Sequence, residues 1–128
     1  MTVLRLTMAS WPSLGASIST GLPVGTEITP LYVKIEPTLK NGVIRDQINI
    51  THNLSKIYLT VENLPFSYDL VDPIGTTPDG WGYLVEISSS KNVKAQAILT
   101  TEILETFTVV NGFRIIELSS LLDEASPI

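Results

Sequence analysis

Apolar residues alternate with polar ones in several short runs along the chain. Residues 31–37 carry leucine, valine and isoleucine at every second position until Pro37, and residues 57–62 repeat this spacing. A period of two places the apolar side chains on one face of a β-strand. A third run, residues 81–87, has the same period with larger side chains. Its apolar face consists of Trp81, Tyr83, Val85 and Ile87.

Turn-forming dipeptides separate these runs. Asn41-Gly42 is a strong hairpin signal after the first strand, and a strand with Ile44, Ile48 and Ile50 on one face is expected to follow it. Asn111-Gly112 predicts another turn of this kind. Further strands are predicted at residues 95–101, 107–110 and 113–118.

A loop rich in Pro, Gly and Asp precedes the 81–87 strand. Asp72-Pro73 starts the loop, Gly75 permits a positive φ, and Pro78-Asp79-Gly80 supplies a turn. We therefore expect a surface loop between two strands. Trp81 and Tyr83 directly after it either face the core or place one ring beside the loop to contact a partner.

Two segments are less regular. Residues 98–105 have apolar spacing that suits a strand or a helix, and we favour a strand. Residues 9–29 are rich in Ser, Gly, Thr and Pro, which predicts an extended arm or a tail with one short strand. The chain is therefore divided into an extended N-terminal arm, residues 1–28, and a β-sandwich domain, residues 29–128. About seven short strands with turns between them predict an all-β fold, a single antiparallel β-sandwich.

Composition narrows the class of protein. The 128 residues suffice for one domain with one core, and only 16% of them are charged, which favours a protein that buries surface against partners. A net charge of −5 and scattered basic residues argue against nucleic-acid binding. No apolar run has the length of a membrane span or a signal peptide, so we expect synthesis in the cytoplasm and no membrane partner. Without cysteine, the chain has no disulfides and no thiol chemistry.

Five motifs follow one another between residues 29 and 128. They are a strand ending in Pro37, Leu64-Pro65, Asp72-Pro73, Pro78-x-Gly-Trp-x-Tyr-x-Val85 and Glu117-Leu-x-x-Leu-Leu-x-x-x-x-Pro127. Their order resembles the small β-sandwich domain of tail and fibre-associated proteins of tailed bacteriophages. Glu117 stands where the family pattern has Asp, and family members often continue into collagen-like, coiled-coil or receptor-binding modules. The resemblance implies a virion structural protein, either a minor tail protein or a capsid decoration protein.

The residue inventory offers little for catalysis. His52 is the one histidine of the chain and is interpreted as a solvated turn residue between two strands. Neither a Gly-x-Ser-x-Gly motif nor a phosphate-binding Gly-x-x-x-x-Gly-Lys motif occurs. We therefore predict a protein that is not an enzyme and needs no cofactor and no metal.

Carboxylates provide two weaker alternatives. Asp69, Asp72 and Asp79 offer oxygens for Ca²⁺, but they lack the spacing of an EF-hand and are interpreted as turn formers. Glu62 with Glu86 is a formal glycosidase pair, for which two surface glutamates on strands are the ordinary explanation.

We therefore expect a bacteriophage virion protein, made in the host cytoplasm, that binds other virion proteins and copies of itself. The contacts are predicted in the arm, in the loop with the strand after it, and near the C-terminus. They are Trp11, Leu14, Ile18, Leu22, Asp72, Pro73, Trp81, Leu121 and Leu122. The alternative is a carbohydrate-binding β-sandwich for host-surface attachment, with an exposed ring stacked on sugar. The candidate rings are those of Trp81, Tyr83, Tyr58 and Tyr68.

Overall fold

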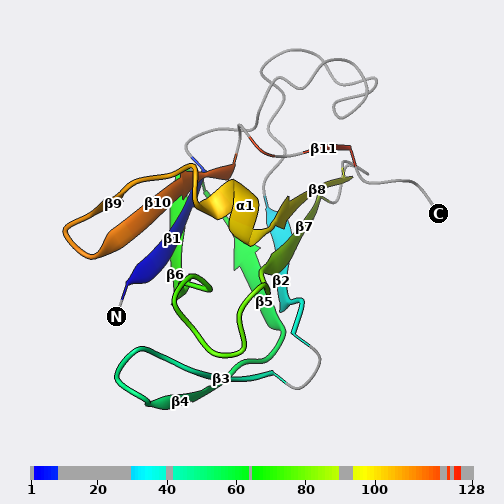
Figure 1. The fold of residues 1–128 in the computed structure, drawn as a ribbon. Coiled ribbons are helices and arrows are strands. Elements are labelled where there is room, and N and C mark those ends of the chain that lie inside the picture. Colours follow the sequence, from blue (N-terminus) through cyan, green and yellow to red (C-terminus); the bar gives the residue numbers. More distant parts are fainter. Residues whose placement is uncertain are drawn as a thin grey trace.

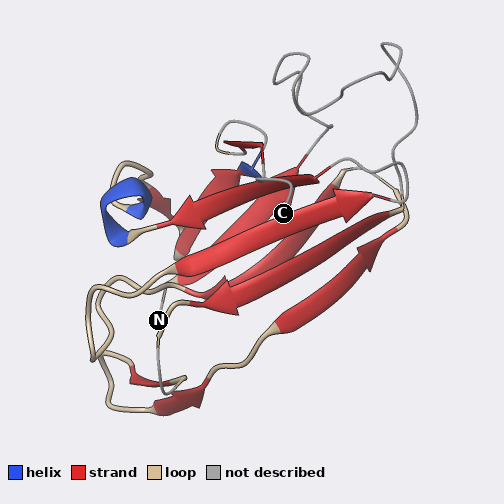
Figure 2. Ribbon diagram, turned by 90° about the vertical axis from the view of Figure 1, so that its right-hand side faces the viewer, coloured by secondary structure: helices blue, strands red, loops and turns tan. Residues whose placement is uncertain are grey.

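The computed structural model describes residues 2–8, 30–39, 42–63, 65–89, 94–118, 121 and 123–124. These residues form two β-sheets that pack together, one helical turn and a separate two-stranded hairpin (Figure 1). Figure 2 shows the strands of one sheet running across the front of the molecule with the other sheet behind them. The predicted all-β sandwich is confirmed.

Sheet A has the strand order β6-β1-β10-β9. Its strands are β1 (Val3–Met8), β6 (Phe66–Val71), β9 (Val109–Val110) and β10 (Phe113–Glu117). β1 runs antiparallel to β6 but parallel to β10, so this sheet is mixed and not purely antiparallel as predicted. The turn between β9 and β10 has a positive φ at both Asn111 and Gly112, which confirms the predicted hairpin there.

Sheet B has the strand order β11-β8-β7-β2-β5, and all neighbours are antiparallel. Its strands are β2 (Leu31–Pro37), β5 (Ile57–Val61), β7 (Tyr83–Ser89), β8 (Lys94–Leu99) and β11 (Asp123–Glu124). Alternate residues such as Val33, Val85 and Ile87 are buried against sheet A. The alternation read from the sequence therefore marks the core face of this sheet.

The first residues of the chain belong to the sandwich and not to an arm. β1 lies between β6 and β10, and Leu4, Leu6 and Met8 are fully buried. The domain boundary predicted at residue 28 differs from the structure for residues 3–8, because their alternation of apolar and polar residues builds a central strand. The remainder of the predicted arm, residues 9–29, lies outside the described residues.

The hairpin predicted around Asn41-Gly42 is not formed with β2, because both edges of β2 are occupied by β5 and β7. The chain instead forms a separate hairpin of β3 (Val43–Arg45) and β4 (Thr51–Asn53). Ile44 is buried, whereas Ile48 and Ile50 lie in the connecting turn and are 69% and 51% exposed. The single strand predicted for these three isoleucines is therefore wrong.

Asp46 holds the turn of the β3–β4 hairpin together. Its Oδ1 accepts hydrogen bonds from the backbone N–H groups of Ile48 and Ile50 at 3.0 and 2.9 Å. Its Oδ2 lies 2.8 Å from Nε2 of His52. His52 is thus a partly buried residue of β4 and not a solvated turn residue. These contacts lower the pKa of Asp46, with the His52 hydrogen bond first, then the Ile50 and Ile48 amides.

The segment 98–105 divides between a strand and a helical turn. β8 ends at Leu99, and α1 (Thr101–Leu104) follows. The Thr100 side chain accepts a hydrogen bond from the Ile103 N–H and caps the turn, and Leu104 is fully buried. The predicted strand is therefore wrong from residue 101 onward.

A buried ion pair joins the end of sheet A to the loop after β6. Arg114 occupies a core-facing position of β10, and its Nε lies 3.0 Å from Oδ2 of Asp72. Only 9% of the Arg114 side chain and 2% of the Asp72 side chain are exposed. Arg114 also donates to the carbonyls of Leu104 and Phe107, so one guanidinium connects β10, the loop and α1.

The substitution Arg114→Met is expected to lower the free energy of unfolding by about 3–5 kcal/mol, because it leaves the Asp72 carboxylate buried without a cation. Urea denaturation measures this loss. Arg5→Met is the matched control, since the Arg5–Asp69 pair is exposed and its removal should lower the free energy of unfolding much less. Equal losses of stability in the two variants would contradict the importance of the buried Arg114–Asp72 ion pair for the fold.

The β3–β4 hairpin is expected to loosen in acid. Because the folded pKa of Asp46 is lowered, its contribution to stability is complete above the ordinary aspartate pKa of about 4 and is lost as the pH falls through the folded value. Hydrogen exchange at the Ile48 and Ile50 amides, followed between about pH 6 and 2, reports the change. Asp46→Asn should remove this acid transition from both amides, and an unchanged transition would contradict the assignment.

Candidate functional site

The outward face of sheet B carries one tyrosine on each of two neighbouring strands. Tyr32 on β2 is opposite Thr60 of β5, and Lys34 on β2 is opposite Tyr58 of β5. The two rings therefore lie diagonally across adjacent strands, on the side opposite the core. We call this surface the tyrosine face. It consists of Tyr32, Lys34, Tyr58, Thr60, Glu86, Ser88 and Lys94.

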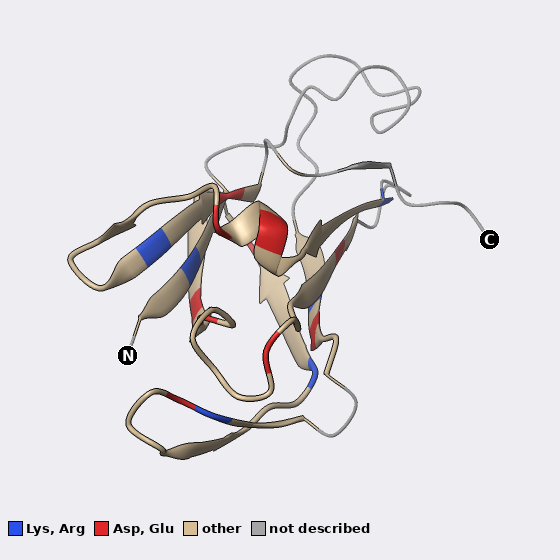
Figure 3. Ribbon diagram, viewed as in Figure 1, with Lys and Arg blue, Asp and Glu red and all other residues tan. Residues whose placement is uncertain are grey.

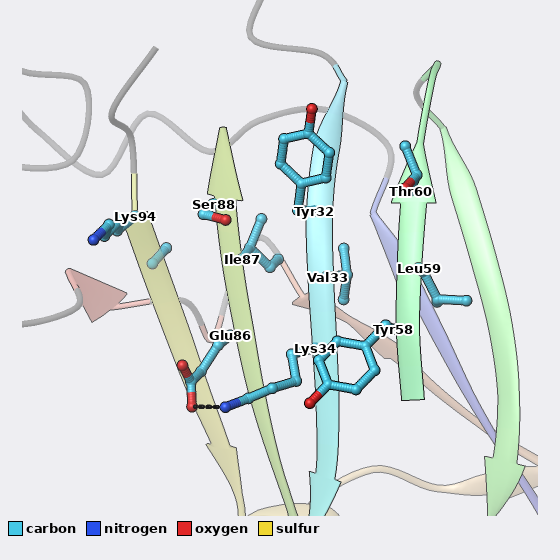
Figure 4. Close-up of a pocket in the computed structure, with 11 residues that line it drawn as sticks. Tyr32, Val33, Lys34, Tyr58, Leu59, Thr60, Glu86, Ile87, Ser88 and Lys94 are labelled. Atoms are coloured by element: carbon cyan, nitrogen blue, oxygen red, sulfur yellow. Dashed lines mark ion pairs between the residues drawn. The ribbon is translucent and has the colours of Figure 1, made fainter. Parts of the chain in front are cut away.

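The tyrosine face is hollowed. A depression of about 450 Å³ lies over β2, β5, β7 and β8, and the residues drawn in Figure 4 line it. Tyr32 is 46% exposed and Tyr58 is 71% exposed, so both rings present apolar area to solvent. Rings of this kind beside a depression are suited to contact with a partner's surface or with a sugar ring.

Charges on the tyrosine face are largely paired. Lys34 Nζ lies 3.3 Å from Oε1 of Glu86, which is directly opposite Lys34 on the neighbouring strand β7 (Figure 4). The hydrogen bond to Glu86 raises the pKa of Lys34 and keeps its ammonium group charged. Beside this face, Lys56 lies 3.7 Å from Glu36. The surface around the tyrosines therefore favours a ligand without a high net charge.

Figure 3 shows basic and acidic residues dispersed over both sheets and the loops. The bidentate pair of Arg5 with Asp69 joins β1 to β6 on the outward side of sheet A. Arg5 also lies over the ring of Phe113, with 4.3 Å from its guanidinium carbon to the ring centroid. These charges stabilise the sheet surface and do not converge on the tyrosine face.

The loop residues predicted as partner contacts are buried inside the chain. Asp72 is bound to Arg114, and Pro73 is also buried. Trp81 is 3% exposed and donates from its indole N–H to Oγ1 of Thr76 at 2.7 Å. The loop and the Trp81 ring therefore close the core, which is the first of the two interpretations given to this ring.

Tyr83 and Tyr68 are also unavailable for stacking on a sugar. Tyr83 is 2% exposed, and its hydroxyl donates to the carbonyl of Val71, which links the two sheets. Burial, followed by the nearby charge of Asp72, raises the pKa of the Tyr83 hydroxyl far above its ordinary value. Tyr68 is partly buried against the core. Of the four rings predicted for sugar binding, only Tyr58 is well exposed.

Of the remaining predicted contacts, Leu121 alone lies within the described residues. Leu121 is partly buried and packs against the core. Leu122 lies outside the described residues, as do all the predicted contacts of the arm. These are Trp11, Leu14, Ile18 and Leu22.

The carboxylates do not form the alternative sites. Asp69 and Asp72 each bind an arginine on a different part of sheet A, and no cluster of three or more metal-ligating side chains occurs among the described residues. Glu86 is separated from the end of β5, where Glu62 follows, by two strand spacings and several residues. That separation is roughly 15 Å, which exceeds the range of a glycosidase pair.

Tyr32 is the candidate-site residue that the sequence analysis did not identify. A signal for it was present, because Tyr32 alternates with the buried Leu31 and Val33 and must therefore face outward. The alternation does not reveal that β2 and β5 are neighbours in the sheet. This pairing brings Tyr32 close to Tyr58.

Within the described part of the chain, no helix is long and apolar enough to cross a lipid bilayer. Comparison with known proteins found no matching family model, no matching curated protein and no matching solved structure. The resemblance to domains of tailed bacteriophages therefore stays a prediction that rests on the order of the sequence motifs.

Proposed function

We propose that this chain is a non-enzymatic structural domain of a bacteriophage particle, a minor tail protein or a capsid decoration protein, that binds neighbouring proteins. The observation that carries the proposal is the tyrosine face, with two exposed rings around a depression on a regular sheet. The motif order between residues 29 and 128 supports the bacteriophage origin.

The tyrosine face has the composition of a protein contact. Tyr32 and Tyr58 supply apolar area with a hydroxyl at one end, and such residues are enriched at the centres of interfaces. Thr60, Ser88 and Lys94 surround them with polar groups, as in the rim of an interface. Burying one of these rings contributes on the order of 2 kcal/mol at about 25 cal/mol per Å² of apolar area.

A carbohydrate ligand is the second candidate, and the same depression favours it. The rings of Tyr32 and Tyr58 offer flat faces for stacking, while Lys34, Glu86 and Ser88 offer hydrogen-bonding groups for sugar hydroxyls. A surface of this kind would attach the particle to host glycans. From the sequence, Trp81 and Tyr83 are among the rings predicted to stack on sugar. In the version of this alternative based on the structure, Tyr32 takes their place.

Tyr58→Ala is expected to reduce the number of copies of the chain in purified particles of the encoding bacteriophage by about tenfold or more, because it removes the most exposed ring of the contact. Quantitative mass spectrometry of particles grown with each variant measures the occupancy. Ile115→Ala, at a 50% exposed position of sheet A, is the matched control and should leave occupancy unchanged. Particles that lack the wild-type chain would contradict the proposed function.

A glycan array separates the two candidates. The assembly proposal expects no glycan signal from the wild-type chain and a loss of particle occupancy in Tyr58→Ala. The carbohydrate candidate expects a glycan signal that Tyr58→Ala and Tyr32→Ala both abolish, with particle occupancy unchanged.

A further inference from the structure

β5 is a margin of sheet B whose outer edge is paired with no other strand in the described part of the chain. It pairs with β2 on one side, and no described strand pairs with its other side. Figure 2 shows this margin along the lower side of the sheet that faces the viewer. An open edge presents backbone N–H and C=O groups that another strand can bind.

β5 lacks the features that normally protect an edge. Its five residues, Ile57–Val61, contain no charge, proline or glycine. The other margins differ. β9 and β11 have two residues each, and β6 carries the exposed Asp69 carboxylate. Among the described margins, β5 is therefore the long uncharged one.

The core-facing residues of β5 are incompletely covered. Ile57 and Leu59 pack against the core, yet both stay partly exposed, whereas the equivalent residues of β2 are buried. An added strand at this margin would cover their open sides. Among the described residues, the margin thus combines a strand edge that no other strand pairs with and apolar area that is incompletely covered.

Charged residues flank β5 symmetrically. Lys56 precedes Leu59 by three positions and Glu62 follows it by three. If a second copy pairs antiparallel with Leu59 opposite Leu59, each Lys56, which contacts Glu36 of its own chain, also lies opposite a Glu62 of the other copy. The same register sets Ile57 opposite Val61 and Tyr58 opposite Thr60. A two-fold axis through this point generates both ion pairs at once.

We infer that the occupant of the β5 edge is a second copy of this chain, joined by antiparallel β5–β5 pairing centred on Leu59. This inference rests on the proposed function and names one of its partners. The paired sheets B would form one continuous sheet, on which the two tyrosine faces lie side by side. Strands of five residues form a small contact, so we expect a dissociation constant in the micromolar range or weaker, sufficient where many copies are held together on a particle.

Charge reversal tests the register. Sedimentation equilibrium of the full chain between about 1 and 500 μM should show a monomer–dimer equilibrium. Glu62→Lys should weaken the dimer about tenfold, since it sets two like-charged pairs across the axis. Combining it with Lys56→Glu should restore the affinity to within about threefold. Glu105→Lys, the same charge change at an exposed residue after α1, should have no effect.

A single cysteine tests the geometry independently. The chain has no cysteine of its own, so Leu59→Cys would carry the only thiol. Two such cysteines directly opposite each other should form a disulfide-linked dimer under mild oxidation. Ile57→Cys is the matched control, because the same register separates the two Ile57 positions by several residues and predicts no cross-link.

The outcomes separate this inference from the proposed function. A chain that stays monomeric at every concentration overturns β5 pairing, and so does a dimer that Glu62→Lys leaves unchanged or that cross-links equally through residues 57 and 59. None of these results affects the Tyr58→Ala test of particle occupancy. A dimer with the predicted charge and cysteine pattern supports the inference even if the chain proves absent from bacteriophage particles.

Discussion

The ion pair between Arg114 and Asp72 is the constraint on which one end of the sandwich depends. A guanidinium at a core-facing position of a strand is costly to bury unless it is paired with an anion and hydrogen-bonded. Here it binds the Asp72 carboxylate and the carbonyls of Leu104 and Phe107. The loop after β6, the α1 turn and β10 must therefore take up their positions together.

The consequences of this ion pair extend through the loop to the second sheet. With Asp72 fixed, Pro73 and Thr76 form a turn in which the Thr76 hydroxyl donates to the Pro73 carbonyl and accepts from the Trp81 indole. Thr77 then pairs with Arg45 and holds the β3–β4 hairpin to the loop. Gly82 follows, where a Cβ would collide with the carbonyl of Leu99, so the entry of β7 passes directly against the end of β8.

Sequence reasoning found the elements whose pattern is local. The alternation around Val33 and Val85 predicts strands because one face of each is buried, and Asn111-Gly112 predicts its hairpin because both residues tolerate positive φ. It failed where distant contacts decide. Asn41-Gly42 has the same signal, but the edges of β2 are taken by β5 and β7. The burial of Leu104 in the core likewise overrides the β propensity of α1, and the adjacent Thr100 caps this turn.

The candidate site could be predicted only in part, for a related reason. Alternation places Tyr32 and Tyr58 outward and Trp81 inward, so the sequence contains the direction of each ring. It does not contain the order of strands in sheet B, which alone makes the two tyrosines neighbours and leaves β5 at the margin. The tyrosine face carries exposed apolar area, and the outer edge of β5 is paired with no strand among the described residues, which is why we propose binding on this side of the molecule.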